Sequence, residues 1–171
     1  MSAENASAGP GLSRRARQVA DELLRRGAHV EVVELPASTR TAAEAASAVG
    51  CDVAQIAKSL VFRAEESNRP VLVIASGANR VDTAAVSRDL GETVVRADAD
   101  WVREVTGYAI GGIPPLAHRT APVTYIDEDL LGLAEIWAAA GTPNSVFRLD
   151  PRSLASLTGG TVIRLALPPT V

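Results

Sequence analysis

Lys58 is the side chain that says most about possible chemistry. It is the only lysine in the chain, and the other sixteen of the 17 basic lysine and arginine residues are arginines. Lysine carries a compact charge on a slim stem, whereas arginine carries a wide planar fork, so a narrow pocket for a phosphate or carbonyl oxygen selects lysine. Apolar neighbours (Ile56, Ala57 and Leu60) place the ammonium at the edge of a core, where a charge acts strongly. A surface lysine between a helix and a strand is the equally weighted alternative.

The segment 106–116 is the second candidate, because it joins Gly111 and Gly112 through Ile113 to Pro114 and Pro115. Glycine permits close approach of a ligand to the backbone, and the two prolines stiffen the chain after them. Such a loop can present fixed N–H groups to a substrate carbonyl and stabilise the oxyanion that forms when water attacks an ester. An ordinary tight turn is the alternative, and the length and rigidity of the segment favour a functional loop.

Asp127 comes directly after an expected strand over 123–126. A carboxylate there could bind a ribose hydroxyl, orient a lysine or act as a base, or it could simply cap the residues after it. His118 is interpreted as a solvated loop residue, His29 as a structural residue in a strand, and Cys51 as a small apolar residue rather than a nucleophile.

Several classes of activity are disfavoured by what the sequence lacks. It has two histidines, one cysteine, no Gly-x-Ser-x-Gly elbow and no cluster with metal-ligand spacing, so we expect neither covalent catalysis nor a metal nor another cofactor. The glycine-rich segments lack nucleotide-binding patterns. The net charge of −3 predicts that any contact with RNA is local. The arginines at 14, 15, 17, 25 and 26 are interpreted as a solvated helix face rather than an RNA patch.

The pattern predicts a single mixed α/β domain over residues 13–171, preceded by a leader over residues 1–12, in a soluble, cytoplasmic protein without a membrane span. Helices are expected from Ser13 to near Gly27, from Thr41 to Gly50, over 53–56, over 83–90 with Asp82 as cap, over 98–105 and from Pro151. Strands are expected over 29–35, from Lys58, and over 71–75, 94–95, 123–126, 135–139, 146–149 and 161–165.

An ordered set of motifs over roughly residues 15–166 resembles the YbaK/ProX family of aminoacyl-tRNA editing domains. The set runs from Thr41–Ala46 and Gly50 through Ile56–Phe62 and Val81-Asp82 to 106–115, Asp127 and 141–143. The resemblance implies a barrel-like mixed sheet flanked by helices. It also implies metal-independent hydrolysis of the ester in a mischarged tRNA, by water assisted by the terminal ribose hydroxyl. The implied partners are the acceptor end of that tRNA, with tRNA-Pro carrying a small noncognate amino acid as the expected substrate, and prolyl-tRNA synthetase.

The resemblance also assigns roles to residues. Lys58 would hold the terminal adenosine phosphate or orient the substrate, Gly111 and the residues to Pro115 would bind the aminoacyl carbonyl, and Asp127 would line the same pocket. Tyr108, Gly141 and Asn144 complete the expected substrate-binding set. Asn144 stands in a segment where many relatives carry a histidine, so selectivity for the side chain can differ. Two other hypotheses stay open: a noncatalytic module that binds aminoacyl-tRNA or a synthetase, and a hydrolase of a small ester unrelated to tRNA.

Overall fold

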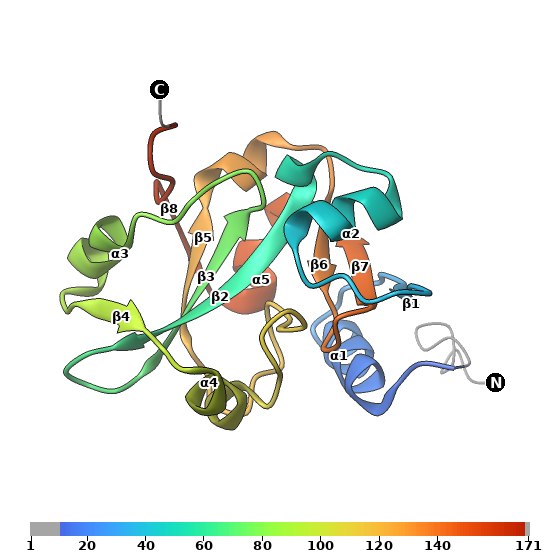
Figure 1. Cartoon of the computed structure of the whole chain (residues 1–171), viewed down its shortest axis with the longest axis horizontal. Coiled ribbons are helices and arrows are strands. Elements are labelled where there is room, and N and C mark those ends of the chain that lie inside the picture. The colour runs from blue at the N-terminus through green and yellow to red at the C-terminus, as the bar shows by residue number, and fades with distance from the viewer. Residues whose placement is uncertain (1–10, 170–171) are drawn as a thin grey trace.

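The computed structural model describes residues 11–169, which form a mixed α/β fold (Figure 1). The leader expected over 1–12 lies almost entirely outside the described residues. The helices are α1 (Arg14–Arg25), α2 (Ala42–Val49), α3 (Thr83–Leu90), α4 (Ala99–Thr106) and α5 (Leu154–Thr158). The strands are β1 (Val32–Glu34), β2 (Ile56–Ala64), β3 (Pro70–Ser76), β4 (Val94–Arg96), β5 (Val123–Asp127), β6 (Ile136–Ala139), β7 (Ser145–Leu149) and β8 (Thr161–Ile163). This architecture confirms the predicted fold class.

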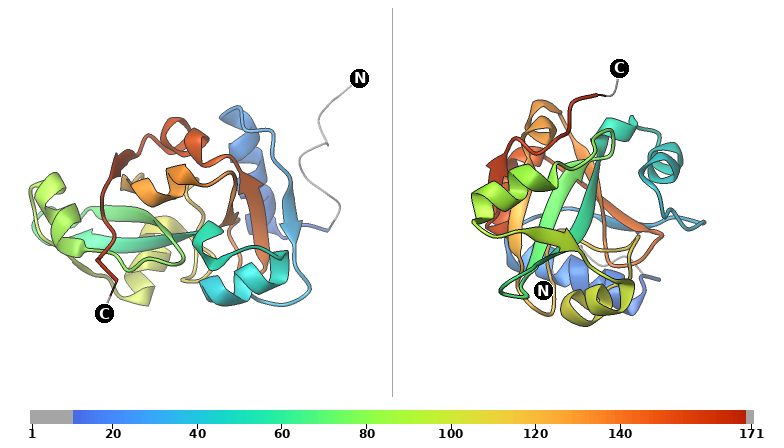
Figure 2. Two further views of the ribbon diagram at one scale, coloured as in Figure 1. Left: turned by 90° about the horizontal axis from the view of Figure 1, so that it is seen from above. Right: turned by 60° about the vertical axis from the view of Figure 1, so that its left-hand side comes forward.

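The strands form an eight-stranded mixed sheet with the order β1-β7-β6-β2-β3-β5-β8, and β4 pairs separately with β2. β2 and β3 are antiparallel over seven residue pairs, from Ala57 opposite Ser76 to Arg63 opposite Pro70. β2 is parallel to β6, and β5 is parallel to both β3 and β8. The sheet curves around the core, as the right-hand view of Figure 2 shows. Helices α1 and α4 and the loop after α4 lie beneath it in Figure 1. The long central strands β2 and β3 are therefore the frame from which the site is built.

Helix starts obey the capping rules that the sequence suggests. Thr41 accepts a hydrogen bond from the N–H of Glu44, Asp82 from those of Ala84 and Ala85, and Asp98 from that of Trp101. An oxygen at this position satisfies N–H groups that have no partner inside the helix. The predicted starts of α2 and α3 are therefore confirmed, and α4 starts one residue later than expected, with Asp98 as its cap rather than its first residue.

The core is built from aliphatic side chains. Residues 71–75 of β3 are completely buried, because α-helices and loops cover both faces of this central strand. Helix α1 packs Ala16, Val19 and Leu23 into the same cluster as Phe147. A sequence with few aromatic residues reaches this burial by close packing of Val, Leu, Ile and Ala.

Three of the expected strands are longer than those observed, the one over 135–139 by a single residue. The predicted strand over 29–35 reduces to β1, and His29 lies before it, exposed, so its assignment to a strand was wrong. The last strand ends at Ile163 rather than at residue 165. β1 pairs only with the three residues Ser145–Phe147 of β7, so the residues before Val32 have no partner strand to extend the ladder. Within residues 11–169, no helix has both the length and the apolar character that a membrane crossing requires.

Candidate active site

A cavity of about 290 Å³ opens where β2 leaves β6. The two strands pair only through Ile56 and Ala57 of β2, opposite Trp137 and Ala138, and β2 then continues along β3. Because β2 and β6 diverge, a space is left beside Lys58. Helix α2 and the loop after α4 form the other walls of this space. The lining consists of Thr39–Ala42, Ala45, Val49, Ile56–Leu60, Ile110, Gly111, Ile113, Trp137–Ala139, Thr142, Pro143, Ser145 and Val146.

Lys58 lies on the wall of this cavity and is half-buried. Its Nζ donates a hydrogen bond to the backbone carbonyl oxygen of Asn79, at 2.6 Å. Burial lowers the pKa of Lys58 below its ordinary value, and the negative charge of Asp127 partly offsets that shift. An ammonium has three N–H donors, so two stay available to a ligand in the cavity.

Asp127 lies at the end of β5, fully buried, and does not line the Lys58 cavity. Its Oδ2 accepts hydrogen bonds from the backbone N–H of Ser76, at 3.0 Å, and from Nδ2 of Asn79, at 2.8 Å. Its Oδ1 accepts one from the N–H of Asp129. The Asn79 amide also donates to Oδ2 of Asp129. Asp127 is therefore linked to Lys58 through Asn79. The side chain of Asn79 is hydrogen-bonded to Asp127, and its backbone carbonyl accepts a hydrogen bond from the Lys58 ammonium.

The loop after α4 forms the opposite wall. Gly111 and Ile113 line the cavity, and Gly112, Pro114 and Pro115 are buried behind them. The N–H of Gly112 donates to the carbonyl of Ala109, but no residue within 11–169 accepts a hydrogen bond from the N–H of Gly111 or Ile113. These two N–H groups therefore have no hydrogen-bond partner among the described residues, on a loop that lines the cavity.

His118 holds this loop in place. Its ring Nε2–H donates to the Pro114 carbonyl at 2.7 Å, which makes Nε2 the protonated nitrogen, because a carbonyl can only accept. Burial lowers the pKa of His118, with the Pro114 hydrogen bond acting in the opposite direction. The sequence-based interpretation of a solvated histidine was wrong, since the ring is largely enclosed and neutral imidazole is favoured.

Tyr108 and Gly141 lie in the core beneath the cavity. The Tyr108 hydroxyl donates to the carbonyl of Ala117, and burial raises the pKa of that phenol. Gly141 has a φ of 99°, and a Cβ there would lie 3.1 Å from both the Arg15 carbonyl oxygen and Cε1 of Tyr108. Both residues support the walls without lining the Lys58 cavity.

Asn144 lies between two residues of the cavity lining but is not part of it. Its Nδ2 donates to the carbonyl of Leu35, and its Oδ1 accepts from the Thr142 hydroxyl. The Thr142 and Ser145 hydroxyls also contact each other. Asn144 therefore ties the 141–145 segment to the end of β1, while Thr142 and Ser145 present polar atoms to the cavity.

Several residues of the site could not be recognised in the sequence. Asn79 carries no signal beyond its place in a turn, and Arg40 is an exposed residue at the cavity mouth beside Gly111. The Ser59 hydroxyl at the wall is buried and has no hydrogen-bond partner among the described residues. A serine directly after the only lysine was the one signal that could have pointed to it.

The cavity offers donors but no side-chain base. Among residues 11–169, its lining contains Lys58, Arg40 and several hydroxyls, and no Asp, Glu, His or Cys. Cys51 lies outside it, and burial together with Asp52 and Glu135 raises the pKa of its thiol, which disfavours a nucleophilic thiolate. No group of three His, Cys, Asp or Glu side chains between residues 11 and 169 is arranged to hold a metal ion. Such a site is suited to binding an electron-rich oxygen, such as a carbonyl or phosphate oxygen.

Gly112→Ala should disturb the loop wall. A Cβ at Gly112 would lie 2.7 Å from the carbonyl carbon of Thr142 and 2.9 Å from its Cα, so the two backbone segments must separate. We expect the free energy of unfolding to fall by about 2 kcal/mol, as for other overpacked positions. Gly132→Ala is the matched control, because a Cβ there meets no atom within 4 Å. Thermal denaturation of both variants checks this, and equal stability of the two would contradict the packing described.

Together these features define the class of protein. It is a mixed α/β domain with a small cavity whose lining includes a lysine, an arginine and a glycine-rich loop. The family is then given by comparison, since residues 36–157 match the model of the aminoacyl-tRNA editing domain. The chain belongs to this family, which confirms the resemblance to YbaK/ProX proteins.

Three relatives illustrate the match. A solved structure of a proposed trans-editing enzyme for prolyl tRNA synthetase is 51% identical, with a TM-score of 0.86 over 92% of this chain and 99% of that chain. The structure of the hypothetical protein APE2540 is 29% identical, with a TM-score of 0.82 over 88% of this chain and 99% of that one. The uncharacterized protein YwhH of Bacillus subtilis (strain 168) is 30% identical over 128 residues, 75% of this chain and 81% of YwhH.

Proposed function

We propose that this protein is a trans-editing deacylase that hydrolyses the ester between a small noncognate amino acid and the 3′ end of a tRNA, with tRNA-Pro as the expected substrate. The observation that carries the proposal is that Lys58 and two loop residues, Gly111 and Ile113, line one small cavity in a member of the editing-domain family, and that the N–H groups of both loop residues have no partner among the described residues. The structural relative described as a proposed trans-editing enzyme for prolyl tRNA synthetase supports the choice of tRNA-Pro and of that synthetase as a partner.

In the proposed mechanism the loop backbone binds the ester carbonyl. The N–H groups of Gly111 and Ile113 stabilise the oxyanion that forms when water attacks, and Lys58 binds the terminal phosphate or orients the ester. Because the lining offers no side-chain base, the vicinal hydroxyl of the terminal ribose assists the attacking water. Asp127 acts as a positioning residue, which holds Asn79 and through it Lys58.

The size of the cavity supports a small aminoacyl group. At about 290 Å³ it is at the lower end of the range for small-molecule sites. A synthetase separates side chains that differ by a methylene by only about 1–3 kcal/mol, so a second pocket that admits small side chains removes its errors. Alanine, cysteine and 2-aminobutyrate are the candidate groups.

A panel of tRNA-Pro charged with Ala, Ser, Cys, Thr or 2-aminobutyrate tests the function. We expect at least one small aminoacyl group to be released faster than in buffer alone, with no added metal required. Absence of turnover on every member, with the protein shown to be folded and to bind the charged tRNA, would favour the noncatalytic module instead. Hydrolysis of a simple amino acid ester with no activity on any charged tRNA would favour the small-ester hydrolase.

A further inference from the structure

A second cavity lies on the other side of the 107–113 loop, between α1 and the end of α4. Its volume is about 620 Å³. The lining is Ser13, Arg14, Arg15, Gln18, Thr106, Gly107, Tyr108, Ala117, His118, Arg119 and Thr142. We call this the arginine cleft, because the part of its lining that the structure describes contains three arginines and no Asp or Glu, although the whole chain has 20 acidic residues and a net charge of −3.

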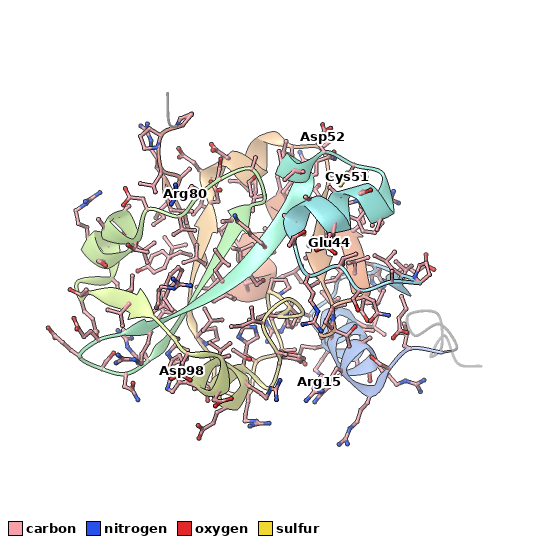
Figure 3. All side chains as sticks on the ribbon, viewed as in Figure 1. Arg15, Glu44, Cys51, Asp52, Arg80 and Asp98 are labelled. Carbon is pink, nitrogen blue, oxygen red and sulfur yellow. The ribbon has the colours of Figure 1, made fainter. Side chains whose placement is uncertain are left out.

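Two of the guanidinium groups converge on the end of α4 from separate segments. Arg15, labelled on α1 in Figure 3, donates from Nε to the carbonyl of Gly107 at 3.2 Å. Arg119 donates from Nη1 to the carbonyl of Glu104 at 3.1 Å, and its Nη2 lies 3.9 Å from where a Cβ on Gly107 would stand. Each arginine uses one N–H to cap a backbone carbonyl at the C-terminal end of α4, a common role for a basic side chain. Each fork has five N–H donors, so four per side chain stay available in a fixed position.

These arginines differ from others on the same helix. Arg25 and Arg26 both form salt bridges with Glu22. Arg14, Arg15 and Arg119 have no carboxylate within 4.0 Å among residues 11–169. Unpaired guanidinium groups around a concave, carboxylate-free surface attract phosphate groups, which they bind bidentately.

The arginine cleft adjoins the candidate active site. Thr142 lines both cavities, and the loop that carries Gly107 and Tyr108 into the cleft carries Gly111 and Ile113 into the Lys58 cavity. A polymer whose end enters the Lys58 cavity can therefore lay its adjoining backbone along the cleft. Among the described residues, the lining has no exposed aromatic side chain on which a base could stack, because Tyr108 is buried and the His118 ring is only partly exposed.

We propose that the arginine cleft binds the sugar-phosphate backbone of the tRNA acceptor stem, with Arg14, Arg15 and Arg119 as the phosphate contacts. This inference rests on the proposed function, since it gives the RNA next to the reacting 3′ end a binding surface. Contacts to phosphate position a nucleic acid without reading its sequence, so the cleft supplies affinity and register but not identity. An acidic peptide of a synthetase is the competing occupant, and adjacency to the Lys58 cavity favours RNA.

The test compares Arg15→Gln/Arg119→Gln with Arg88→Gln/Arg96→Gln, a matched control on α3 and β4 at the far end of the molecule (Figure 1). Both double variants remove two positive charges. Each is assayed on charged tRNA and on an aminoacylated 3′-terminal trinucleotide, at about 50 and about 200 mM salt. Thermal denaturation confirms that both are folded.

We expect the cleft variant to raise KM for charged tRNA about tenfold at low salt, roughly threefold for each phosphate that no longer binds an arginine, and to show a shallower salt dependence. Turnover of the trinucleotide and the kinetics of the control should match the wild type. An equal effect on both substrates, no effect on tRNA, or the same effect in the control would each overturn the proposal.

Binding of uncharged tRNA separates this inference from the proposed function. If the wild type hydrolyses no charged tRNA, the proposed deacylase function is wrong. Fluorescence titration with uncharged tRNA then still measures the affinity of the arginine cleft for RNA. Weaker RNA binding by the cleft variant alone would support the cleft. Unchanged RNA binding combined with abolished binding to a polyglutamate peptide would overturn the RNA assignment.

Discussion

Lys58→Ala is expected to lower the rate of deacylation by about 100-fold or more, the usual effect of removing a donor that stabilises developing charge in an active site. The ammonium lies on the cavity wall with two free N–H donors, and no other lysine exists to replace it. Lys58→Arg should rescue little of this activity, because the planar fork is wider than the stem and ammonium it replaces. Single-turnover assays on charged tRNA measure both variants.

Arg63→Ala provides the control for Lys58. Arg63 is a basic residue on the same strand, opposite Pro70, and is not part of the cavity lining. We expect near-normal turnover from Arg63→Ala, and wild-type melting temperatures from all folded variants within a few degrees. Wild-type turnover by Lys58→Ala would remove Lys58 from the mechanism.

Asp127→Asn is expected to reduce both stability and activity. The fully buried carboxylate accepts three hydrogen bonds, and hydrogen bonds to a charged group contribute about 1.5–3 kcal/mol each. Since an asparagine oxygen still accepts some of these bonds, we expect the free energy of unfolding to fall by about 3 kcal/mol in urea denaturation. Asp129→Asn is the matched control, because Asp129 is exposed and its side chain accepts only from Asn79 among the described residues.

The pH dependence of activity separates positioning of Lys58 from a merely structural role of Asp127. Burial lowers the pKa of Lys58 and the Asp127 charge raises it, so removal of that charge lowers it further. Lys58 then loses its proton at a lower pH than in the wild type. The alkaline limb of kcat/KM, corrected for spontaneous ester hydrolysis, should therefore move to lower pH. An unchanged alkaline limb in a folded Asp127→Asn protein would contradict the effect of the Asp127 charge on Lys58.

The sequence predicted the features that depend on local chemistry. Thr41 and Asp82 were predicted as helix caps because their side-chain oxygens reach N–H groups two or three residues ahead, and that requirement is visible in the sequence. The apolar run at 71–75 is a buried strand for an equally local reason. Lys58 and Gly111, which the sequence marks as candidates separately, line one cavity.

The remaining parts depend on contacts between distant segments. The cavity exists because β2 pairs with β6 at only two residues before it diverges, and no local pattern encodes where parallel strands separate. The path from Asp127 through Asn79 to Lys58 joins three segments, and its last link is a backbone carbonyl that has no sequence signature. Arg119 and Arg15 likewise lie in one cleft only because both donate hydrogen bonds to carbonyls at the end of α4.

A crystal structure with a nonhydrolysable analogue, in which an amide replaces the ester of 3′-alanyl-adenosine 5′-phosphate, tests the proposed site most directly. We predict that the aminoacyl carbonyl accepts hydrogen bonds from the N–H groups of Gly111 and Ile113, and that Lys58 contacts the analogue while keeping its bond to Asn79. An analogue seated elsewhere, with the Lys58 cavity empty and the loop N–H groups unbound, would contradict this assignment.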